Sequence, residues 1–303
     1  MNEYPNKKQL LVNPEDYKLF FREYSSLDEF LKLIITMPIN HDVFHDLEDL
    51  SSVRYIMTFN YFKTFEEAWN ACYYGWNHKF EDFKEKIARV ETQIISDLSK
   101  TKQLNISGYY PNVPLFLKNN PRNMIDTNNQ MKSTRTIVIN FNADISSFES
   151  QDAIINRGVC LISLIKHLEK RYNVVLNLLD IGFEYESPKN EMIYTIINLK
   201  KETEKINIKK LYFPLVNPDF LRRLCFRNRE CTFGINKSWV YTYGYPYIPS
   251  IQENKNSILV STPAEMNITG ENLKEDYYSF MRYIERQMTN DEDNILKHTK
   301  KIE

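Results

Sequence analysis

The feature that most constrains the fold is an alternation of strand and helix patterns in the second half of the 303-residue chain. The strand patterns are short and rich in β-branched residues, and the helical patterns carry an apolar stripe at helical spacing. This alternation predicts an α/β fold. We expect strands over residues 135–141, 173–185, 191–200 and 257–262, and helices over residues 150–171, 217–228 and 271–288.

The connections between these elements predict how the strands run. A helix between two consecutive strands makes them parallel, with a right-handed connection. The turn SPKN at 187–190 is too short for a crossover, so the strand at 191–200 should run antiparallel to the one at 173–185 and lie at an edge. We therefore predict a doubly wound, mostly parallel sheet with one antiparallel edge strand.

The first half of the chain is expected to be mainly helical. Helical patterns begin at Ser26 and Thr64, and each is followed by a Glu three residues later, which predicts a capping box. Residues 106–134 are rich in Asn and Pro and predict a connector. We therefore divide the chain into an N-terminal region over 1–105, this connector, an α/β domain over 135–290 and a charged tail over 291–303.

The composition argues against several classes of function. The net charge of −1 gives no global attraction to nucleic acid or to an anionic membrane, and no apolar run is long enough to span a bilayer. Gly occurs only 7 times, and the chain has no P-loop, dinucleotide-binding motif or Gly-x-Ser-x-Gly elbow. We therefore assign no catalytic residue and expect no cofactor other than a metal ion in the loop over 140–147.

The loop NFNADISS at 140–147 carries several oxygen-bearing side chains directly after the first of these strands. The order of elements and this loop resemble the von Willebrand factor A domain, in which the first strand ends in a metal-binding Asp-x-Ser-x-Ser loop. The resemblance implies a Mg²⁺ site that is short of carboxylates. The candidate ligands are Asn140, Asn142, Asp144 and Ser146.

Two departures make this metal site degenerate. Asn140 stands where the family has its first aspartate, and Ser261 and Thr262 stand where a later acidic residue is expected. The alternative is that Asp144 and Ser146 form a hydrogen-bonded turn that caps the following helix.

Four further segments are similar to an uncharacterised family of tailed-phage proteins. The resemblance covers most of residues 60–285 and implies a phage origin, a place in the host cytoplasm or on the virion, and a shared fold. It implies no activity, because none of the segments is a catalytic signature. The segments are TFEEAWNACYYGW (64–76), GYYPNVPLFLKNNPRNM (108–124), NPDFLRRLCF (217–226) and YGYP (243–246).

The most concentrated basic cluster consists of four arginines, Arg222, Arg223, Arg227 and Arg229. Guanidinium groups suit phosphate, and aromatic residues flank the cluster in sequence, so the pattern is one that a nucleic-acid strand could use. The alternative is a solvated helix face whose arginines pair with acids.

Three aromatic residues, Trp69, Tyr73 and Trp76, fall close together on a predicted helix. Such a face usually belongs to a packed core, and the alternative is a surface on which the two halves of the chain dock, since Trp and Tyr are favoured at interfaces. The sequence leaves both interpretations open.

Two other pairs of residues have the chemistry of metal ligands but not the pattern. His41 and His45 are spaced as zinc ligands on a helix, and no third ligand accompanies them. Cys225 and Cys231 are spaced too widely for a zinc ribbon or a redox pair, and we expect Cys225 in the core.

These observations order three hypotheses. The first is a non-enzymatic interaction or assembly protein that binds another phage or host protein. The second is a nucleic-acid-binding or processing protein that uses the four arginines. The third is a metal-dependent enzyme or adhesion site at the 140–147 loop.

Overall fold

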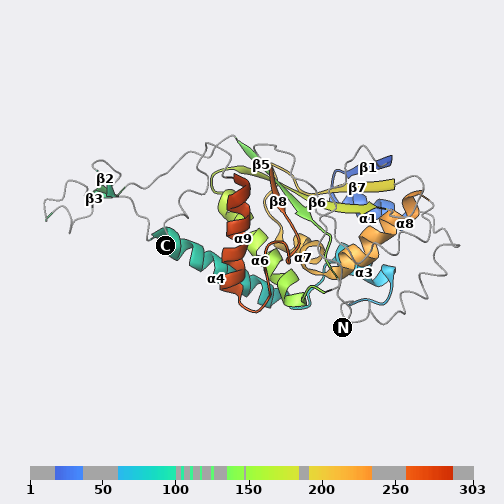
Figure 1. Ribbon diagram of the computed structural model, residues 1–303, viewed down its shortest axis with the longest axis horizontal. Helices are drawn as coiled ribbons and strands as arrows, with labels where there is room; N and C mark the ends of the chain where they lie inside the picture. The colour runs from blue at the N-terminus through green and yellow to red at the C-terminus, as the bar shows by residue number, and fades with distance from the viewer. Residues whose placement is uncertain are drawn as a thin grey trace, which may run out of the picture.

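The protein is an α/β structure, described here from a computed structural model that places residues 18–36, 61–99, 104–105, 110–111, 117, 124–125, 135–146, 148–183, 191–233 and 257–288 (Figure 1). Its strands are β1 (Lys18–Tyr24), β2 (Leu104–Asn105), β3 (Tyr110–Pro111), β4 (Met124–Ile125), β5 (Thr136–Asn142), β6 (Asn173–Phe183), β7 (Glu191–Lys200) and β8 (Ser257–Val260). Its helices are α1 (Leu27–Thr36), α3 (Phe65–Tyr74), α4 (Phe80–Ser99), α6 (Gln151–Leu168), α7 (Ile208–Val216), the π-helix η2 (Phe220–Cys225), α8 (Phe226–Phe233) and α9 (Leu273–Met288).

A five-stranded sheet in the order β1-β7-β6-β5-β8 organises the molecule, and β2, β4 and β3 form a separate small sheet. The pairs β1/β7, β6/β5 and β5/β8 are parallel, and β7/β6 is antiparallel. The sheet is therefore mostly parallel, and the antiparallel pairing predicted from the short turn at 187–190 is confirmed.

The prediction that the strand at 191–200 lies at an edge is wrong. β1 pairs in parallel with β7 along its whole length, from Lys18 opposite Glu191 to Tyr24 opposite Ile197, so β7 is an internal strand. The N-terminal segment thus supplies the edge of the same sheet that holds β5 to β8. The helices α1, α3 and α4 share the core of that sheet.

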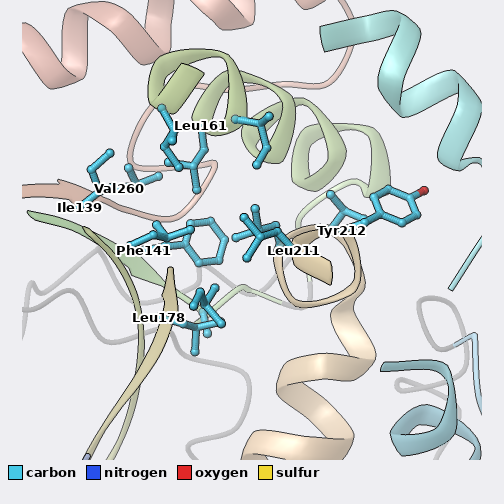
Figure 2. Packing of buried hydrophobic residues seen from close by; sticks show 14 of the residues in the cluster. Ile139, Phe141, Leu161, Leu178, Leu211, Tyr212 and Val260 are labelled. Carbon is cyan, nitrogen blue, oxygen red and sulfur yellow. The ribbon is translucent and has the colours of Figure 1, made fainter. Parts of the chain in front are cut away.

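The main buried cluster lies on one face of the sheet. Every strand residue in the main buried cluster falls on this face, including Ile139 of β5, Leu178 of β6 and Val260 of β8. Figure 2 shows these side chains meeting Leu161 of α6 and Leu211 of α7. A doubly wound sheet would carry helices on both faces, whereas the helices of the described part of the chain pack on one.

The helix predicted over 217–228 forms as the π-helix η2 followed directly by α8, which continues to Phe233. It is preceded by α7, a separate helix that the sequence did not predict and that ends at Val216. The capping box predicted at Thr64 is confirmed, because Thr64 and Glu67 each accept the backbone N–H of the other. At Ser26 only half of the predicted box forms: Ser26 Oγ accepts the N–H of Glu29, whereas the Glu29 carboxylate accepts the N–H of Ser25.

The opposite face of the sheet carries a row of amide side chains that crosses four strands. Asn198 donates to Asn177 at 3.0 Å, Asn177 donates to Asn140 at 3.2 Å, and Asn140 donates to Ser257 at 2.9 Å. Each side chain in the row is half-buried. The row links β7, β6, β5 and β8 by side-chain bonds in addition to the backbone ladder.

In the described part of the chain, no helix combines the length and apolar character needed to cross a membrane.

Candidate functional site

The carboxyl ends of β5 and β8 form the most informative part of the molecule. From β5 the chain passes through α6 to β6 on one side, while β8 pairs with the other side of β5. Ligands of α/β sheets bind outside the carboxyl ends of strands at such a switch point. Charged side chains from α6, α8, β6 and the loop after β5 converge here.

Arg157 of α6 lies between the ends of the two strands. Its Nη1 donates to the backbone oxygens of Asn142 and Ser261, at 3.1 Å from each, and its guanidinium lies 4.3 Å from the ring centre of Phe141. The side chain is fully buried, and burial lowers its pKa to about 9, with Glu149 and Asp144 opposing that shift. A protein guanidinium therefore bridges the two strand ends at the switch point.

Glu149 closes the loop that follows β5. Its Oε1 accepts the backbone N–H of Ala264 at 2.9 Å, which joins this loop to the one after β8. Burial raises the pKa of Glu149, and the Ala264 bond and the charge of Arg157 act in the opposite direction. The carboxylate thus faces a buried cation and a backbone donor.

Arg229 of α8 binds two buried carboxylates. Its Nη2 donates to Asp144 Oδ1 at 2.7 Å, and its Nε donates to Asp180 Oδ1 at 3.0 Å, with a further contact from Nη2 to Asp180. Asp180 and Asp144 are 0% and 4% exposed and Arg229 is 3% exposed, so water contributes little to the solvation of these charges. Buried charges of this kind are stable only when they are paired, as they are here.

A neutral polar chain continues from Arg229 toward the β1 edge. The neighbouring residue Asn228 accepts from the hydroxyl of Tyr24 at 2.7 Å and donates to Thr195 at 3.1 Å. All three are buried, and burial raises the pKa of Tyr24. α8 is therefore fixed by polar contacts to β6, β7 and β1.

The structure separates the four residues proposed as metal ligands. Asn140 belongs to the amide row within β5. Asn142 is buried and accepts the backbone N–H of Asp144 at 3.0 Å, Asp144 binds Arg229, and Ser146 accepts the N–H of Phe148. Among the described residues, no group of three or more His, Cys, Asp and Glu side chains could hold a metal ion.

The four arginines also point to different partners. Arg227 lies over the ring of Phe65 at 4.7 Å and is 8% exposed, while Arg223 donates to the backbone oxygen of Phe62 at 3.1 Å. Arg222 is half-buried, and burial lowers its pKa. With Arg229 in the buried cluster, the sequence cluster does not form one exposed basic patch.

Asp219, at the start of η2, anchors the segment before α3. Its Oδ2 accepts the backbone N–H groups of Tyr61 and Phe62 at 2.6 and 3.1 Å, and its Oδ1 lies 4.0 Å from Arg223 Nε. Burial raises the pKa of Asp219 to about 6, although these hydrogen bonds and the nearby arginines Arg223 and Arg222 oppose the shift.

The three aromatic residues have two different environments. Trp76 packs against Tyr212 with ring centres 5.1 Å apart. Trp69 donates from Nε1 to the backbone oxygen of Leu31 and stacks on Tyr73, with ring centres 4.7 Å apart. Tyr73 is 42% exposed, so this pair reaches the surface. Trp76 lies beyond the end of α3, not on it as predicted, and packs on α7.

The described cysteines do not suit nucleophilic catalysis. Cys72, Cys160 and Cys225 are buried free cysteines, and burial raises the pKa of each, which makes them poor nucleophiles at neutral pH. His41, His45 and the side chain of Cys231 lie outside the described residues.

Sequence reasoning missed Arg157, Asp180 and Tyr74. The first two are charged residues inside apolar runs of a helix and a strand, and this interruption was the available signal of a buried ion pair. Tyr74 directly follows Tyr73 and is 75% exposed, which no periodic pattern indicated.

Comparison with known proteins places the chain in one family. No curated protein and no solved structure is significantly similar to the chain. One family model, described as Domain of unknown function (DUF7192), matches residues 6–302. Since that match spans nearly the whole sequence, the chain belongs to the DUF7192 family.

Proposed function

We propose that the protein is a non-enzymatic interaction or assembly protein that binds a partner protein through the exposed end of α1 and α3. The observation that carries the proposal is a surface stack of three aromatic rings, Trp69, Tyr73 and Tyr74. We call these three residues the aromatic stack.

The geometry of the aromatic stack suits a protein partner. Trp69 and Tyr73 are nearly parallel, and Tyr74 meets both rings edge-on, with ring centres 5.1 Å from Tyr73 and 6.4 Å from Trp69. The rings are held in place by one another and by the bond from Trp69 to α1. Rigid Trp and Tyr side chains lose little entropy on binding and dominate many interfaces.

An exposed apolar residue of α1 lies near this surface in the sequence of the helix. Ile35 is 46% exposed and lies one turn beyond Leu31, whose backbone oxygen binds Trp69. Exposed apolar side chains beside aromatic anchors commonly mark a protein contact. The aromatic stack and α1 together therefore supply both anchors and a surrounding apolar area.

We assign the buried charges at the switch point a role in stabilising the fold and not in binding a substrate. Arg157 and Arg229 are matched by backbone oxygens and by the carboxylates of Asp144 and Asp180. A reacting group would need access to substrate, and these side chains are 0–4% exposed. The proposal therefore places the function on the surface of the protein.

We further propose that β7, β6, β5 and β8 with α6 and α9 form a degenerate von Willebrand factor A-like unit. The reversed strand β7 and the order of these four strands support this relationship. A phage origin, with action in the host cytoplasm or on the virion, rests on the resemblance of the four sequence segments to tailed-phage proteins.

The test is a comparison of partner capture by three forms of the full chain. Tagged wild type, the double variant Tyr73→Ala/Tyr74→Ala and the control Phe148→Ala would be expressed in phage-infected cells, and captured proteins identified by mass spectrometry. Phe148 is an 81% exposed aromatic residue on the β5–α6 loop, outside α1 and α3. A captured partner would then be purified and its affinity measured by calorimetry.

We expect the double variant to weaken binding by about 30-fold or more, since loss of an interface anchor typically costs about 2 kcal/mol or more. The control should bind as wild type does. Equal affinity of wild type and the double variant, or the absence of any specific partner, would contradict the proposal.

A further inference from the structure

β8 is an end strand of the sheet in the described part of the chain, and its sequence carries none of the usual defences of an edge. Residues 257–262 read SILVST and contain no charge, no proline and no glycine. β8 also pairs with β5 in an unbroken parallel register, without a bulge. Short uncharged segments rich in β-branched residues are prone to pair with a strand of another molecule. This edge therefore needs protection from elsewhere in the fold.

A side chain of α9 supplies that protection. The side-chain amide of Gln287 bonds both backbone groups of Leu259, with the N–H of Leu259 donating to Oε1 and Nε2 donating to the carbonyl oxygen of Leu259, each at 2.8 Å. A primary amide offers a donor and an acceptor side by side, as the backbone of a neighbouring strand does. Gln287 thus takes the place of that strand on β8.

The apolar face of α9 directs Gln287 to this place. Tyr277, Phe280 and Ile284 of α9 are buried in the core. Gln287 follows Ile284 by three positions and Phe280 by seven, so it lies on the same stripe of the helix. α9 packs beside β8 (Figure 1). The core-facing stripe of α9 therefore ends in an amide at the point where it meets the polar edge of a strand.

The first turn of α9 is fixed by the buried carboxylate of Asp276. Its Oδ1 accepts the backbone N–H of Thr269 at 2.8 Å, and its Oδ2 accepts the backbone N–H of Gly270 at 3.0 Å. Oδ2 also accepts Nδ2 of Asn156 from α6 at 2.8 Å. These bonds fix the rotation of α9 about its axis, which keeps Gln287 aligned with Leu259.

We propose that Gln287 is an edge guard, an intramolecular contact that keeps β8 from pairing with a strand of another molecule of this protein. The contact gives the N–H and the carbonyl of Leu259 partners within the chain, so a second strand gains less by adding there. It explains how the described sheet can end at an uncharged strand. The guard does not involve the aromatic stack, which lies on α3 and is bonded to α1.

The experiment compares variants of the full chain that lack the amide. Gln287→Met keeps the length of the side chain and removes its donor and its acceptor, and Gln287→Ala is a second variant that also removes its volume. The matched control is Arg282→Ala, at an exposed position of the same helix whose bond to Ser279 is long, at 3.4 Å. Circular dichroism and urea unfolding would establish that each variant is folded.

Hydrogen exchange tests the contact itself. In the wild type, the amide of Leu259 should exchange slowly, although no strand pairs with that side of β8 among the described residues. We expect this amide to exchange about tenfold faster in Gln287→Met at high dilution, since a hydrogen bond of ordinary net strength protects an amide by roughly that factor. Arg282→Ala should leave the exchange rate unchanged.

Sedimentation at increasing protein concentration tests what the guard prevents. We expect Gln287→Met and Gln287→Ala to associate about tenfold or more tightly than the wild type and Arg282→Ala do. Adding Ser257→Pro should remove this gain, because proline opposes strand addition at an edge and is tolerated at the first residue of a strand. Adding Tyr73→Ala/Tyr74→Ala should leave the gain unchanged.

Three results would overturn the proposal. They are equal exchange of the Leu259 amide in wild type and Gln287→Met, association of Gln287→Met no tighter than that of Arg282→Ala, and added association that survives Ser257→Pro. The last result would show that a surface other than β8 joins the molecules. Partner capture through the aromatic stack can succeed or fail in each case, so the two proposals fail separately.

Discussion

Replacement of Arg229 by Met should destabilise the fold strongly. The substitution removes the cation shared by Asp144 and Asp180, whose residues are 4% and 0% exposed, and leaves both carboxylates in the interior without their guanidinium donor. Removing one member of a buried ion pair typically costs about 3–5 kcal/mol. That is a large share of the roughly 5–15 kcal/mol that stabilises an ordinary protein.

Urea unfolding followed by circular dichroism would measure this cost. With a slope of about 3 kcal/mol per molar urea, the loss corresponds to a midpoint lower by about 1 M or slightly more. The matched control is Lys210→Met, which breaks a surface ion pair with Asp28 at 2.8 Å. Both partners of that pair are more than a third exposed, so its loss should cost less than about 1 kcal/mol.

A triple variant separates unpaired charge from lost packing. Asp144→Asn/Asp180→Asn in the Arg229→Met background removes the two stranded charges at nearly constant volume, and we expect it to be more stable than Arg229→Met alone. The reasoning would be refuted if Arg229→Met cost no more than Lys210→Met, or if the triple variant were the least stable of the series.

Two further predictions concern other buried positions. The pKa of Asp219, raised by burial to about 6 from 3.8, means that the folded state binds this proton more tightly than the unfolded state, so its contribution to stability falls as the pH rises from about 4 to about 6. Urea midpoints between pH 4.5 and 7 should therefore show wild type gaining about 2 kcal/mol on acidification relative to Asp219→Asn, and parallel pH profiles would contradict the assignment. Gly158→Ala would place a Cβ 2.7 Å from Val216 Cγ1, so it should cost about 1–3 kcal/mol in thermal unfolding. Val216→Ala in the same chain should recover part of that loss, and a destabilisation that Val216→Ala only increases would argue against a steric cause.

The strands of the sheet could be predicted from sequence where each carries a clear apolar run. β5, β6, β7 and β8 each follow from such a run, and the short turn SPKN identified the antiparallel pair. β1 could not be identified in the same way, because its partner β7 lies far along the chain and KLFFREY has a mixed pattern. Long-range parallel pairing leaves no local signal in either strand.

The candidate site was predicted in part for a similar reason. Asp144 and Arg229 were both identified as functional candidates, but their pairing across 85 positions could not be deduced from either motif. Asn140 was counted among the loop ligands although it also lies in the strand predicted over 135–141, and the alternation of β5 turns it to the face opposite the helices. Asn140 therefore bonds to side chains of the neighbouring strands instead of joining the other expected ligands.

The buried charged side chains connect the fold to the proposed function, because they hold the helices in place on the sheet. Arg157 and Arg229 join α6 and α8 to the carboxyl ends of the strands through bonds with fixed direction, and a buried ion that loses its partner is costly, so these contacts restrict how the helical layer can sit on the sheet. α8 also reaches β1 through Asn228 and Tyr24, which fixes the edge strand that carries Phe21. An ordered aromatic stack is what recognition by a rigid surface requires, because flexible groups would lose entropy on binding. The interior charges thus hold in place the layer of helices whose surface carries the aromatic stack.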